Sequence, residues 1–456
     1  MSSSGLPSDQ RTYIKRADHQ VYEAQRAWNL VPGSTNEVSA ANTDEMVRSL
    51  LEDCISRREK GCLYHAKRLD NFTGSSPIVT SETIEAAKLL LTDEEKRNIE
   101  YAHKRIFTFA REQRSNIKDT EIELSKGFHV GSKFLPVSTA GCYVPGGRFA
   151  HIASALMTVT TAKAAGVKCI RVTTPVRTEI EVNRVKVPSP HPAVLYALHI
   201  AGADQILSLG GVQGIAALGL GLFGGSPADI ICGPGNKYVA AAKRILFSEH
   251  GVGMDLVAGP TEVAIIADHT ADPTVVAWDL VSQCEHGPTS PAVLMTSSKD
   301  LGVQVMNMMS NIIDKLPSPN RETAKTSWDK CGEIIFCSTR EELCKLSDEV
   351  ASEHLQVMCN DLEYYHDRLQ NYGSLFLGKS TTVSMGDKAS GPNHVLPTMR
   401  ASRYTGGLSV LSFLKCLSWQ RPTDASAREV ARVTAEISRL EGMEGHARAA
   451  DIRSKL

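Results

Sequence analysis

The sequence predicts an α/β protein with two similar Rossmann-like domains, each a doubly wound parallel sheet, plus a helical N-terminal segment and a C-terminal tail. The 456-residue chain is too long for one ordinary hydrophobic core. From about residue 141 onward, short apolar segments alternate with helix-like stretches, as expected for strands that helices cover on both faces. Strands are expected at 167–175, 204–211 and 229–236 in the first unit and at 262–268, 291–298, 333–339, 355–360 and 374–378 in the second.

The segment before the first sheet is expected to be an irregular arm followed by helices. Residues 1–40 are polar and contain the turn cluster VPGSTN, whereas the pattern is helical from there to about residue 118. In the helix expected at 92–113, Thr92 precedes Glu95 by the three positions of a capping box. Apolar residues recur at helical spacing along one face, which therefore packs on another part of the protein: Ile99, Ala102, Ile106, Phe109 and Ala110.

These segments suggest the following domains. We expect residues 141–261 to form one Rossmann-like domain, and residues 41–140 and 262–390 together to form a second, discontinuous one. In such sheets ligands bind outside the carboxyl ends of the strands, where the turns GGVQ and GPGN fall. The last segment, 391–456, begins with the loop GPNHVLPT and continues as a charged helix interrupted by glycines. A tail this polar typically crosses onto another subunit or caps a domain.

Composition narrows the class of partner. The 50 basic and 51 acidic residues nearly cancel, which argues against a nucleic acid or an anionic membrane as the main partner. The polar start MSSSGLPSDQ has no apolar core of a secretory signal, and GIAALGLGLFGG is too short for a span of about 20 residues. The 11 cysteines include no C-x-x-C pair, so we expect reduced thiols in a cytoplasmic protein.

Several imidazole, carboxylate and amide groups are candidate ligands. Gln283 and His286 lie three positions apart near the end of a helix opened by Asp272 and Pro273, and Asp387 lies in a Gly- and Ser-rich loop. Each of these residues alone is equally compatible with helix capping, loop capping or a solvated surface. With His446 they form a mixed nitrogen and oxygen set, free of thiolate, that suits zinc and leaves it open to substrate.

The chain resembles the histidinol dehydrogenase family from about residue 40 to about 450. The resemblance rests on nine motifs in order: GCYVPGGR, TAKAAGV, LGGVQGIAALG, GPGNKYV, DLVAGPTEV, DLVSQCEHGP, SEHLQ, GDKASGPNHVLPT and EGMEGHA. It implies an enzyme that oxidises a primary alcohol through an aldehyde to a carboxylate, with two molecules of NAD⁺. It also implies one Zn²⁺ per subunit and a homodimer with composite active sites.

The resemblance assigns residues to these roles. Zinc would be held by Gln283, His286 and Asp387 together with His446 of the partner subunit. The NAD residues would be Tyr143, Gln213 and Asn236. Substrate would contact the four zinc ligands, His354 and three further residues: Thr261, where the family usually has Ser, His394 and Glu441.

The adjacent pair Glu353 and His354 matches the catalytic pair of the family. His354 would be the general base that removes the alcohol proton, and Glu353 would activate the water that attacks the aldehyde. Imidazole titrates near neutral pH, and a carboxyl group in a closed site can be raised toward it, so both residue types suit these roles.

The dinucleotide and the substrate are less directly indicated. The chain has no G-x-G-x-x-G followed about 20 positions later by an acid, so the common NAD fingerprint is absent. Motifs such as RLEGMEGHARAAD resemble the branch of sulfopropanediol dehydrogenases, whose anionic substrate would need donors such as Arg400 and Arg403. Glu441, in contrast, would fit the imidazole of histidinol better than it fits an anionic substrate. The alternatives are an authentic L-histidinol dehydrogenase, a zinc-dependent hydrolase with the same ligands, and a non-catalytic homologue.

Overall fold

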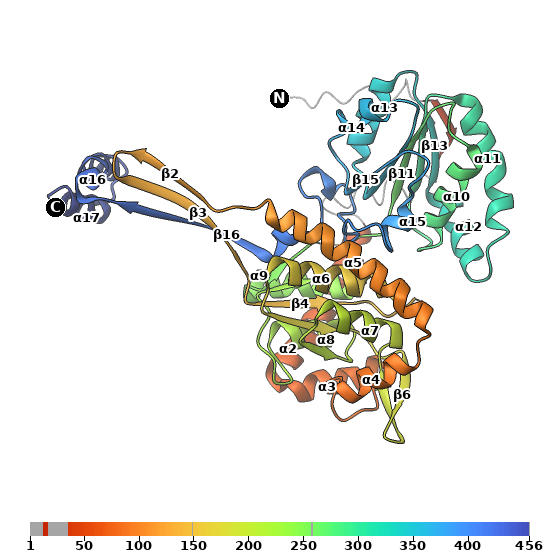
Figure 1. The fold of residues 1–456 in the computed structure, drawn as a ribbon, viewed down its shortest axis with the longest axis horizontal. Helices are drawn as coiled ribbons and strands as arrows, with labels where there is room; N and C mark the ends of the chain where they lie inside the picture. Colours follow the sequence, from red (N-terminus) through yellow and green to blue (C-terminus); the bar gives the residue numbers. More distant parts are fainter. Residues whose placement is uncertain (1–11, 17–34, 148, 257–258, 456) are drawn as a thin grey trace.

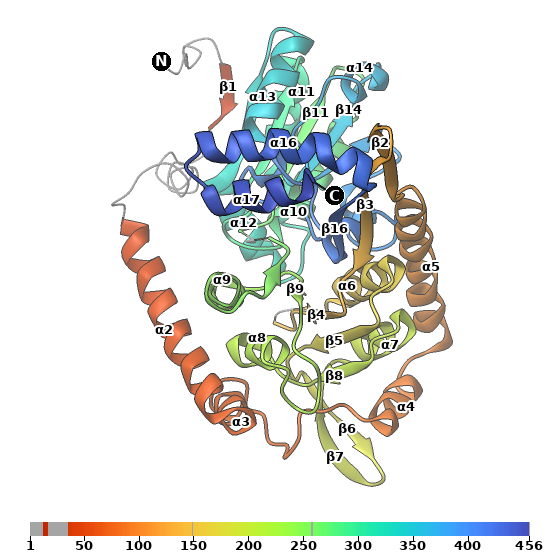
Figure 2. The ribbon, with the colours of Figure 1, turned by 90° about the vertical axis from the view of Figure 1, so that its left-hand side faces the viewer.

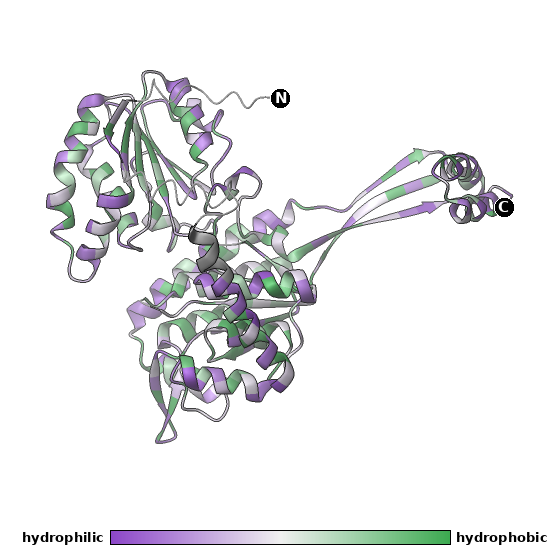
Figure 3. Cartoon of the chain, turned by 180° about the vertical axis from the view of Figure 1, so that it is seen from behind, coloured by the Kyte–Doolittle hydropathy of each residue, from purple (hydrophilic) through white to green (hydrophobic). Residues whose placement is uncertain are grey.

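Two parallel sheets, each covered by helices on both faces, form the body of the protein, and a long β arm extends away from it (Figure 1). The computed structural model describes residues 12–16, 35–147, 149–256 and 259–455. Apolar residues are concentrated in the strands of the two sheets (Figure 3). Within the described residues, no helix is both long and apolar enough to cross a bilayer.

The first sheet has five parallel strands in the order β10-β9-β4-β5-β8. Helices α6 and α7 pack on one face of this sheet, and α8 and α9 pack on the other. Its elements are β4 (Thr139–Tyr143), α6 (Ile152–Ala165), β5 (Cys169–Thr173), the hairpin β6 (Thr178–Val182) and β7 (Val185–Ser189), α7 (Pro192–Ala201), β8 (Gln205–Leu207), α8 (Gly211–Gly219), β9 (Ile230–Cys232), α9 (Lys237–His250) and β10 (Gly253–Met254).

The second sheet has six strands in the order β1-β13-β12-β11-β14-β15, and only β1 runs antiparallel to its neighbour. Helices α10 to α12 cover one face, and α13 and α14 cover the other. Its elements are β1 (Thr12–Lys15), β11 (Val263–Ala267), α10 (Pro273–Cys284), β12 (Ala292–Thr296), α11 (Lys299–Ile313), α12 (Asn320–Cys331), β13 (Gly332–Phe336), α13 (Arg340–Val350), β14 (His354–Met358), α14 (Leu362–His366), β15 (Ser374–Leu377) and α15 (Val383–Gly386).

The predicted fold class is confirmed as α/β with parallel sheets, and each predicted strand overlaps a strand of the structure. Numbered along the chain, the five parallel strands of both sheets follow the same order, 3-2-1-4-5. Each sheet therefore has a point where the strand order reverses, between β4 and β9 in one and between β11 and β14 in the other. Such reversal points are where doubly wound sheets bind ligands.

The N-terminal helices pack on the first sheet, whereas we expected residues 41–140 to join residues 262–390. Apolar residues of α4 and α5 belong to the same core as α6 and α7, and those of α2 and α3 belong to the core around α8 and α9. Helix α5 has the predicted capping box of Thr92 and Glu95. The four helices are α2 (Thr35–Arg57), α3 (Glu59–Leu69), α4 (Ser81–Leu89) and α5 (Asp93–Ser115).

The predicted irregular arm of residues 1–40 needs a similar correction. Residues 12–15 form strand β1, which pairs with β13, and helix α2 already begins at Thr35. The apolar Ile14 packs among the core residues of the second domain, which explains why this short segment is extended. The rest of the predicted arm lies outside the described residues.

The β arm replaces part of the predicted C-terminal helical tail. Strands β2 (Thr120–Ser125), β3 (Phe128–Pro136) and β16 (Leu414–Pro422) form an antiparallel sheet that the sequence did not predict. It carries α16 (Asp424–Leu440) and α17 (Glu444–Arg453) to a position far from both domains, as Figure 1 shows. Figure 2 looks along the arm, with these two helices in front of the domains. The predicted interruption is present, since Gly442 adopts a φ of 78° between the two helices. Before the arm, 391–413 contains the short helices η2 (Ala401–Arg403) and η3 (Val410–Phe413).

Candidate active site

Glu353 and His354 lie at the amino end of β14, beside the point where the strand order of the second sheet reverses. His354 is paired in register with Val263 of β11, and its main-chain N–H donates to the carbonyl of Glu262. This is the opposite edge from the one where parallel sheets usually bind ligands. The pair therefore faces the residues that precede β11 and the first domain.

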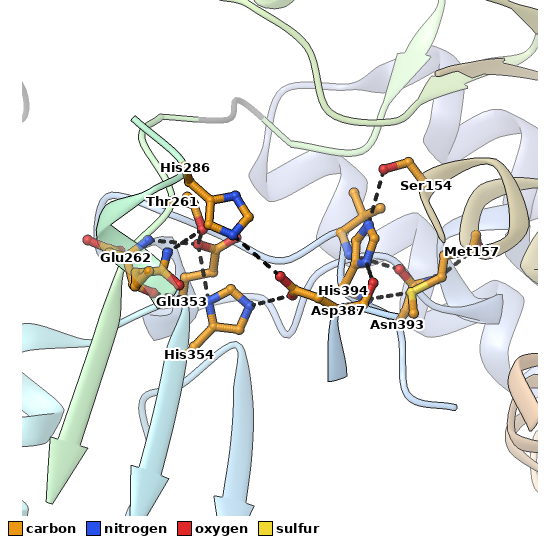
Figure 4. Close-up of polar contacts among 12 residues, drawn as sticks. Ser154, Met157, Thr261, Glu262, His286, Glu353, His354, Asp387, Asn393 and His394 are labelled. Carbon is orange, nitrogen blue, oxygen red and sulfur yellow. Dashed lines mark hydrogen bonds and ion pairs between the residues drawn. The ribbon is translucent and has the colours of Figure 1, made fainter. Parts of the chain in front are cut away.

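Glu353 is buried in a cluster of hydrogen-bond donors (Figure 4). Its Oε2 accepts hydrogen bonds from Thr261 Oγ1 at 2.5 Å and from the main-chain N–H of Glu262 at 2.9 Å. Thr261 Oγ1 in turn accepts from Gln283 Nε2 at 2.8 Å. Burial raises the pKa of Glu353, although the neighbouring His354 and these donors oppose the rise.

His354 lies between two carboxylates. Its Nδ1 is 3.0 Å from the carbonyl oxygen of Glu262 and 3.4 Å from Glu353 Oε2, and its Nε2 is 3.4 Å from Asp387 Oδ1. Burial disfavours the imidazolium, but Glu353 and Asp387 together raise the pKa of His354 to about 9. Nε2 is buried, and its contact with Asp387 is long for a hydrogen bond.

Asp387 and His394 connect this pair to the first domain. Burial by itself would raise the pKa of Asp387. The hydrogen bond and the charge of His354 outweigh this effect and hold the pKa of Asp387 below its usual range. His394 Nδ1 lies 2.8 Å from the carbonyl oxygen of Asp387, and His394 Nε2 lies 3.2 Å from Ser154 Oγ on α6. Figure 4 shows this continuous polar contact from β14 to α6. The site therefore lies where the two domains meet.

Three of the four predicted metal ligands are grouped beside the pair. His286 Nε2 lies 3.8 Å from Asp387 Oδ2, and Gln283 reaches the same cluster through Thr261. His286 follows the end of α10 and is more exposed than the others, and burial lowers its pKa, which favours the neutral form that binds metals. No group of three His, Cys, Asp or Glu side chains with metal-binding geometry occurs among the described residues.

The fourth predicted ligand, His446, lies in α17 at the tip of the arm and is exposed, as is the predicted substrate residue Glu441. Within one chain, neither residue reaches the cluster around His354 (Figure 1). The arm therefore separates both from the site that the family resemblance assigns to them.

The predicted NAD residues lie at the carboxyl edge of the first sheet. Tyr143 ends β4, and its hydroxyl accepts a hydrogen bond from the N–H of Gly211 at 3.3 Å. Gln213 lies in the first turn of α8 and is buried, and its Oε1 has no hydrogen-bond partner in the described structure. Asn236 is exposed and caps α9 by accepting from the N–H groups of Tyr238 and Val239.

Comparison with known proteins places the chain in a family. The sequence pattern of histidinol dehydrogenases matches residues 34–454. The chain belongs to the histidinol dehydrogenase family. Its members are oxidoreductases that act on CH–OH groups of their donors.

Family relatives differ in their names. The chain is 49% identical to a histidinol dehydrogenase homolog of Pelagibacter ubique, over 92% of this chain and 96% of the relative. It is 48% identical to the sulfopropanediol 3-dehydrogenase of Ruegeria pomeroyi, over 92% and 94% of the two chains. The crystal structure of histidinol dehydrogenase from Elizabethkingia anophelis is 30% identical and covers 96% of both chains, with a TM-score of 0.85.

A cavity of about 130 Å³ adjoins His354. His354, Asp387 and His394 line it on one side. The rest of its lining mixes the polar residues Ser374, Thr381, Ser390 and Asn393 with the apolar residues Leu375, Phe376, Pro392 and Leu396. A space of this size suits a small molecule, and His354, Asp387 and His394 provide polar contacts for it.

Two acidic residues in these clusters were missed by reasoning from the sequence. Glu262 supplies the carbonyl that holds His354 and is itself partly buried. Desolvation and the charge of Glu353 raise its pKa to about 8. Asp70, at the end of α3, accepts a hydrogen bond from Gln213 Nε2 at 2.6 Å. Glu262 follows directly on Thr261 in the AGPTE motif, which was a usable signal, whereas nothing near Asp70 in sequence pointed to a site.

Proposed function

We propose that this protein is a zinc- and NAD-dependent dehydrogenase that oxidises a primary alcohol through an aldehyde to a carboxylate. The observation that carries the proposal is the buried contact of Glu353 and His354 with each other, with Thr261 and with Asp387. A base and a second proton-accepting group are both buried, and the base lines a small cavity. This arrangement suits an oxidation that needs first an alkoxide and then a hydrated aldehyde.

The pair has two successive roles in this proposal. His354 in its neutral form takes the proton of the alcohol as a hydride leaves the same carbon. Glu353 then takes a proton from the water that attacks the aldehyde, and the hydrated aldehyde loses a second hydride. The balanced reaction converts one alcohol, one water and two NAD⁺ into one carboxylate and two NADH with release of protons.

The donor set fits a zinc ion. Gln283 uses its amide nitrogen to bond Thr261, which leaves its carbonyl oxygen as a donor, and His286 and Asp387 add imidazole and carboxylate. Bound there, zinc would orient the alcohol and stabilise negative charge on its oxygen. Because His446 is remote in its own chain, the fourth ligand would be His446 of the partner subunit.

The arm supports a homodimer with composite sites. Apolar side chains on α16 and at its end are exposed, including Val433, Ile437 at 50% and Leu440 at 89%. The strands of the arm also expose Ile122 and Leu124. A second copy would cover these residues and bring Glu441 with His446 to the site.

The proposal of an NAD site is supported by Oε1 of Gln213. This buried acceptor has no hydrogen-bond donor among the described residues, and a bound dinucleotide could supply one. It lies beside Tyr143 at the carboxyl edge of the first sheet, where doubly wound folds bind dinucleotides. NAD, when bound, would supply the hydride acceptor. A zinc hydrolase would have no use for this second site.

The substrate is proposed to be a small hydroxylated anion such as a sulfonated propanediol, with L-histidinol as the alternative. The proposal is supported by identity: 48% to the sulfopropanediol 3-dehydrogenase against 34% to the histidinol dehydrogenase 1 of a Nostoc species. Arg403 lies on the short helix η2 and Arg400 precedes it, in the loop that follows His394, so both remain candidate anion contacts.

The test is to supply zinc-loaded protein with NAD⁺ and either 2,3-dihydroxypropane-1-sulfonate or L-histidinol, and to count NADH per substrate. Two NADH per sulfonate would support the proposal, and two per histidinol alone would support the alternative. Hydrolysis without NADH formation would contradict both and favour a hydrolase. His354→Gln should retain zinc and lose turnover.

A further inference from the structure

Asp70 joins the two buried residues that line the proposed dinucleotide site. Its Oδ2 accepts hydrogen bonds from Gln213 Nε2 at 2.6 Å and from the main-chain N–H of Gly210 at 3.2 Å. Its charge also acts on Tyr143, whose pKa burial raises to about 12 and Asp70 raises further. Asp70 thus belongs to one cluster with Tyr143, Gln213 and the start of α8.

The position of Asp70 is that of an adenosine-ribose contact. A β-carbon on Gly210 would lie 2.8 Å from Pro175, which follows the end of β5, and 3.1 Å from Asp70 Oδ2. Asp70 therefore lies beside the carboxyl ends of β5 and β8, the second and third strands of the 3-2-1-4-5 sheet. In doubly wound dinucleotide-binding sheets, an acid at the end of the second strand accepts a hydrogen bond from the ribose 2′-hydroxyl. Here the acid comes from α3, outside the sheet.

Two acceptor atoms of this cluster lack a hydrogen-bond donor in the described part of the chain. Both donors described above reach Oδ2, so Asp70 Oδ1 is without a hydrogen bond in the described part of the chain. Gln213 Oε1, in a side chain that is 1% exposed, is a second acceptor without a partner there. A ribose offers hydroxyl donors, whereas a 2′-phosphate offers only negative charge and acceptors.

Among the described residues, no lysine or arginine contributes to the electrostatics of Asp70. Burial is the main influence on Asp70 and raises its pKa, and the only opposing influences are the bonds from Gln213 and Gly210. Arg177, which follows β5 at a short distance, donates to the carbonyl of Gly147 instead. A 2′-phosphate at this position would meet the Asp70 carboxylate, with no compensating cation from the described residues.

We propose that Asp70 determines the dinucleotide preference of this protein, by accepting a hydrogen bond from the adenosine ribose and by excluding a 2′-phosphate. The inference rests on the proposed function in placing a dinucleotide at this edge. Asp70 also positions Gln213, because it holds the amide nitrogen and so fixes the side on which Oε1 lies.

The test is direct binding of NADH and NADPH by isothermal titration calorimetry to wild-type protein and to Asp70→Asn and Asp70→Ala. Asparagine retains an acceptor for Gln213 and Gly210 but removes the negative charge. Asp229→Asn is the matched control, since Asp229 Oδ2 also accepts two main-chain N–H groups, from Ser138 and Thr139, at the opposite edge of the same sheet.

We expect the wild type to bind NADH more tightly than NADPH, and Asp70→Asn to reduce that preference by about 10-fold, the factor of one charged hydrogen bond. Asp229→Asn should leave the preference unchanged. Equal weakening of NADH and NADPH in Asp70→Asn would overturn the proposal and leave Asp70 a purely structural residue. Equal wild-type affinities, or no binding of either dinucleotide, would also overturn it.

The two proposals can fail separately. If NADH binds with the expected preference but no alcohol reduces NAD⁺, the proposed oxidation fails and the role of Asp70 is supported. If alcohol oxidation proceeds equally with NAD⁺ and NADP⁺, the proposed function stands and the role of Asp70 is refuted.

Discussion

Replacing Glu353 by Gln should separate the two roles of the catalytic pair. Glutamine keeps the shape and one acceptor oxygen for Thr261 and Glu262, so the fold around β14 should persist. It removes the negative charge that lies 3.4 Å from His354 Nδ1. The variant therefore changes the protonation of His354 and eliminates the group that would activate water.

The size of the effect follows from the environment of His354. An opposite charge within about 4–6 Å favours the charged form by about 1–3 pH units. The pKa of His354 is raised to about 9 by Glu353 and Asp387 against the effect of burial. Without Glu353, the pKa should fall by about 1–3 units, since Asp387 still favours the imidazolium.

The assay is the pH dependence of the first hydride transfer, measured as single-turnover NADH formation. A general base must be neutral, so the rate should rise with pH through the pKa of His354. In Glu353→Gln this rise should occur at lower pH, while steady-state turnover yields one NADH and the aldehyde instead of two NADH and the carboxylate. The second oxidation should slow by about 10²–10⁴-fold.

Glu262→Gln is the matched control. Burial and Glu353 raise the pKa of Glu262 to about 8, so its carboxyl group is mostly neutral below that pH and glutamine imitates it. Below about pH 8, its single-turnover rate should therefore remain close to that of the wild type. An unchanged profile in Glu353→Gln, or a shift to higher pH, would refute the charge coupling between Glu353 and His354.

Three further outcomes are expected. Thr261→Val, which loses the hydroxyl that bonds Glu353 and Gln283, should destabilise the protein by about 2 kcal/mol or more in thermal denaturation, whereas Thr261→Ser should cost less; equal losses would contradict this reading. Because the folded pKa of Glu262 is raised to about 8, its stabilising contribution is present at acid pH and is lost as pH rises from about 4.5 to 8. Glu262→Gln should therefore flatten the fall in melting temperature over that window, and parallel curves would argue against it. Arg171→Met removes a fully buried guanidinium that donates to main-chain carbonyls at the end of α8 and should cost at least about 3 kcal/mol, so an unchanged melting temperature would contradict its structural role.

Much of the fold was readable from the sequence because its signals are local. Buried parallel strands are continuous apolar runs, and every predicted run overlaps a strand of the structure. The capping box of Thr92 and Glu95 depends only on residues three apart. The same holds for Glu353 and His354, which are neighbours in the chain and therefore close in any fold.

Other features depend on packing between distant segments. Helix α5 is amphipathic wherever it packs, so its sequence could not tell which of two similar sheets would cover its apolar face. Strands β3 and β16 pair across almost 300 positions of sequence, and their half-exposed residues lack a strong apolar run. Their arm is what removes His446 from the site within its own chain.

The sequence by itself determined that two parallel sheets would form and that Glu353 and His354 would stand together at a strand end, because neighbouring residues dictate those features. Only the tertiary structure decided which charges meet. Asp387 reaches His354 from a loop beyond β15, and Asp70 reaches Gln213 across 143 positions of chain. Such contacts arise when helices and loops are packed onto the sheets, and no local pattern encodes them.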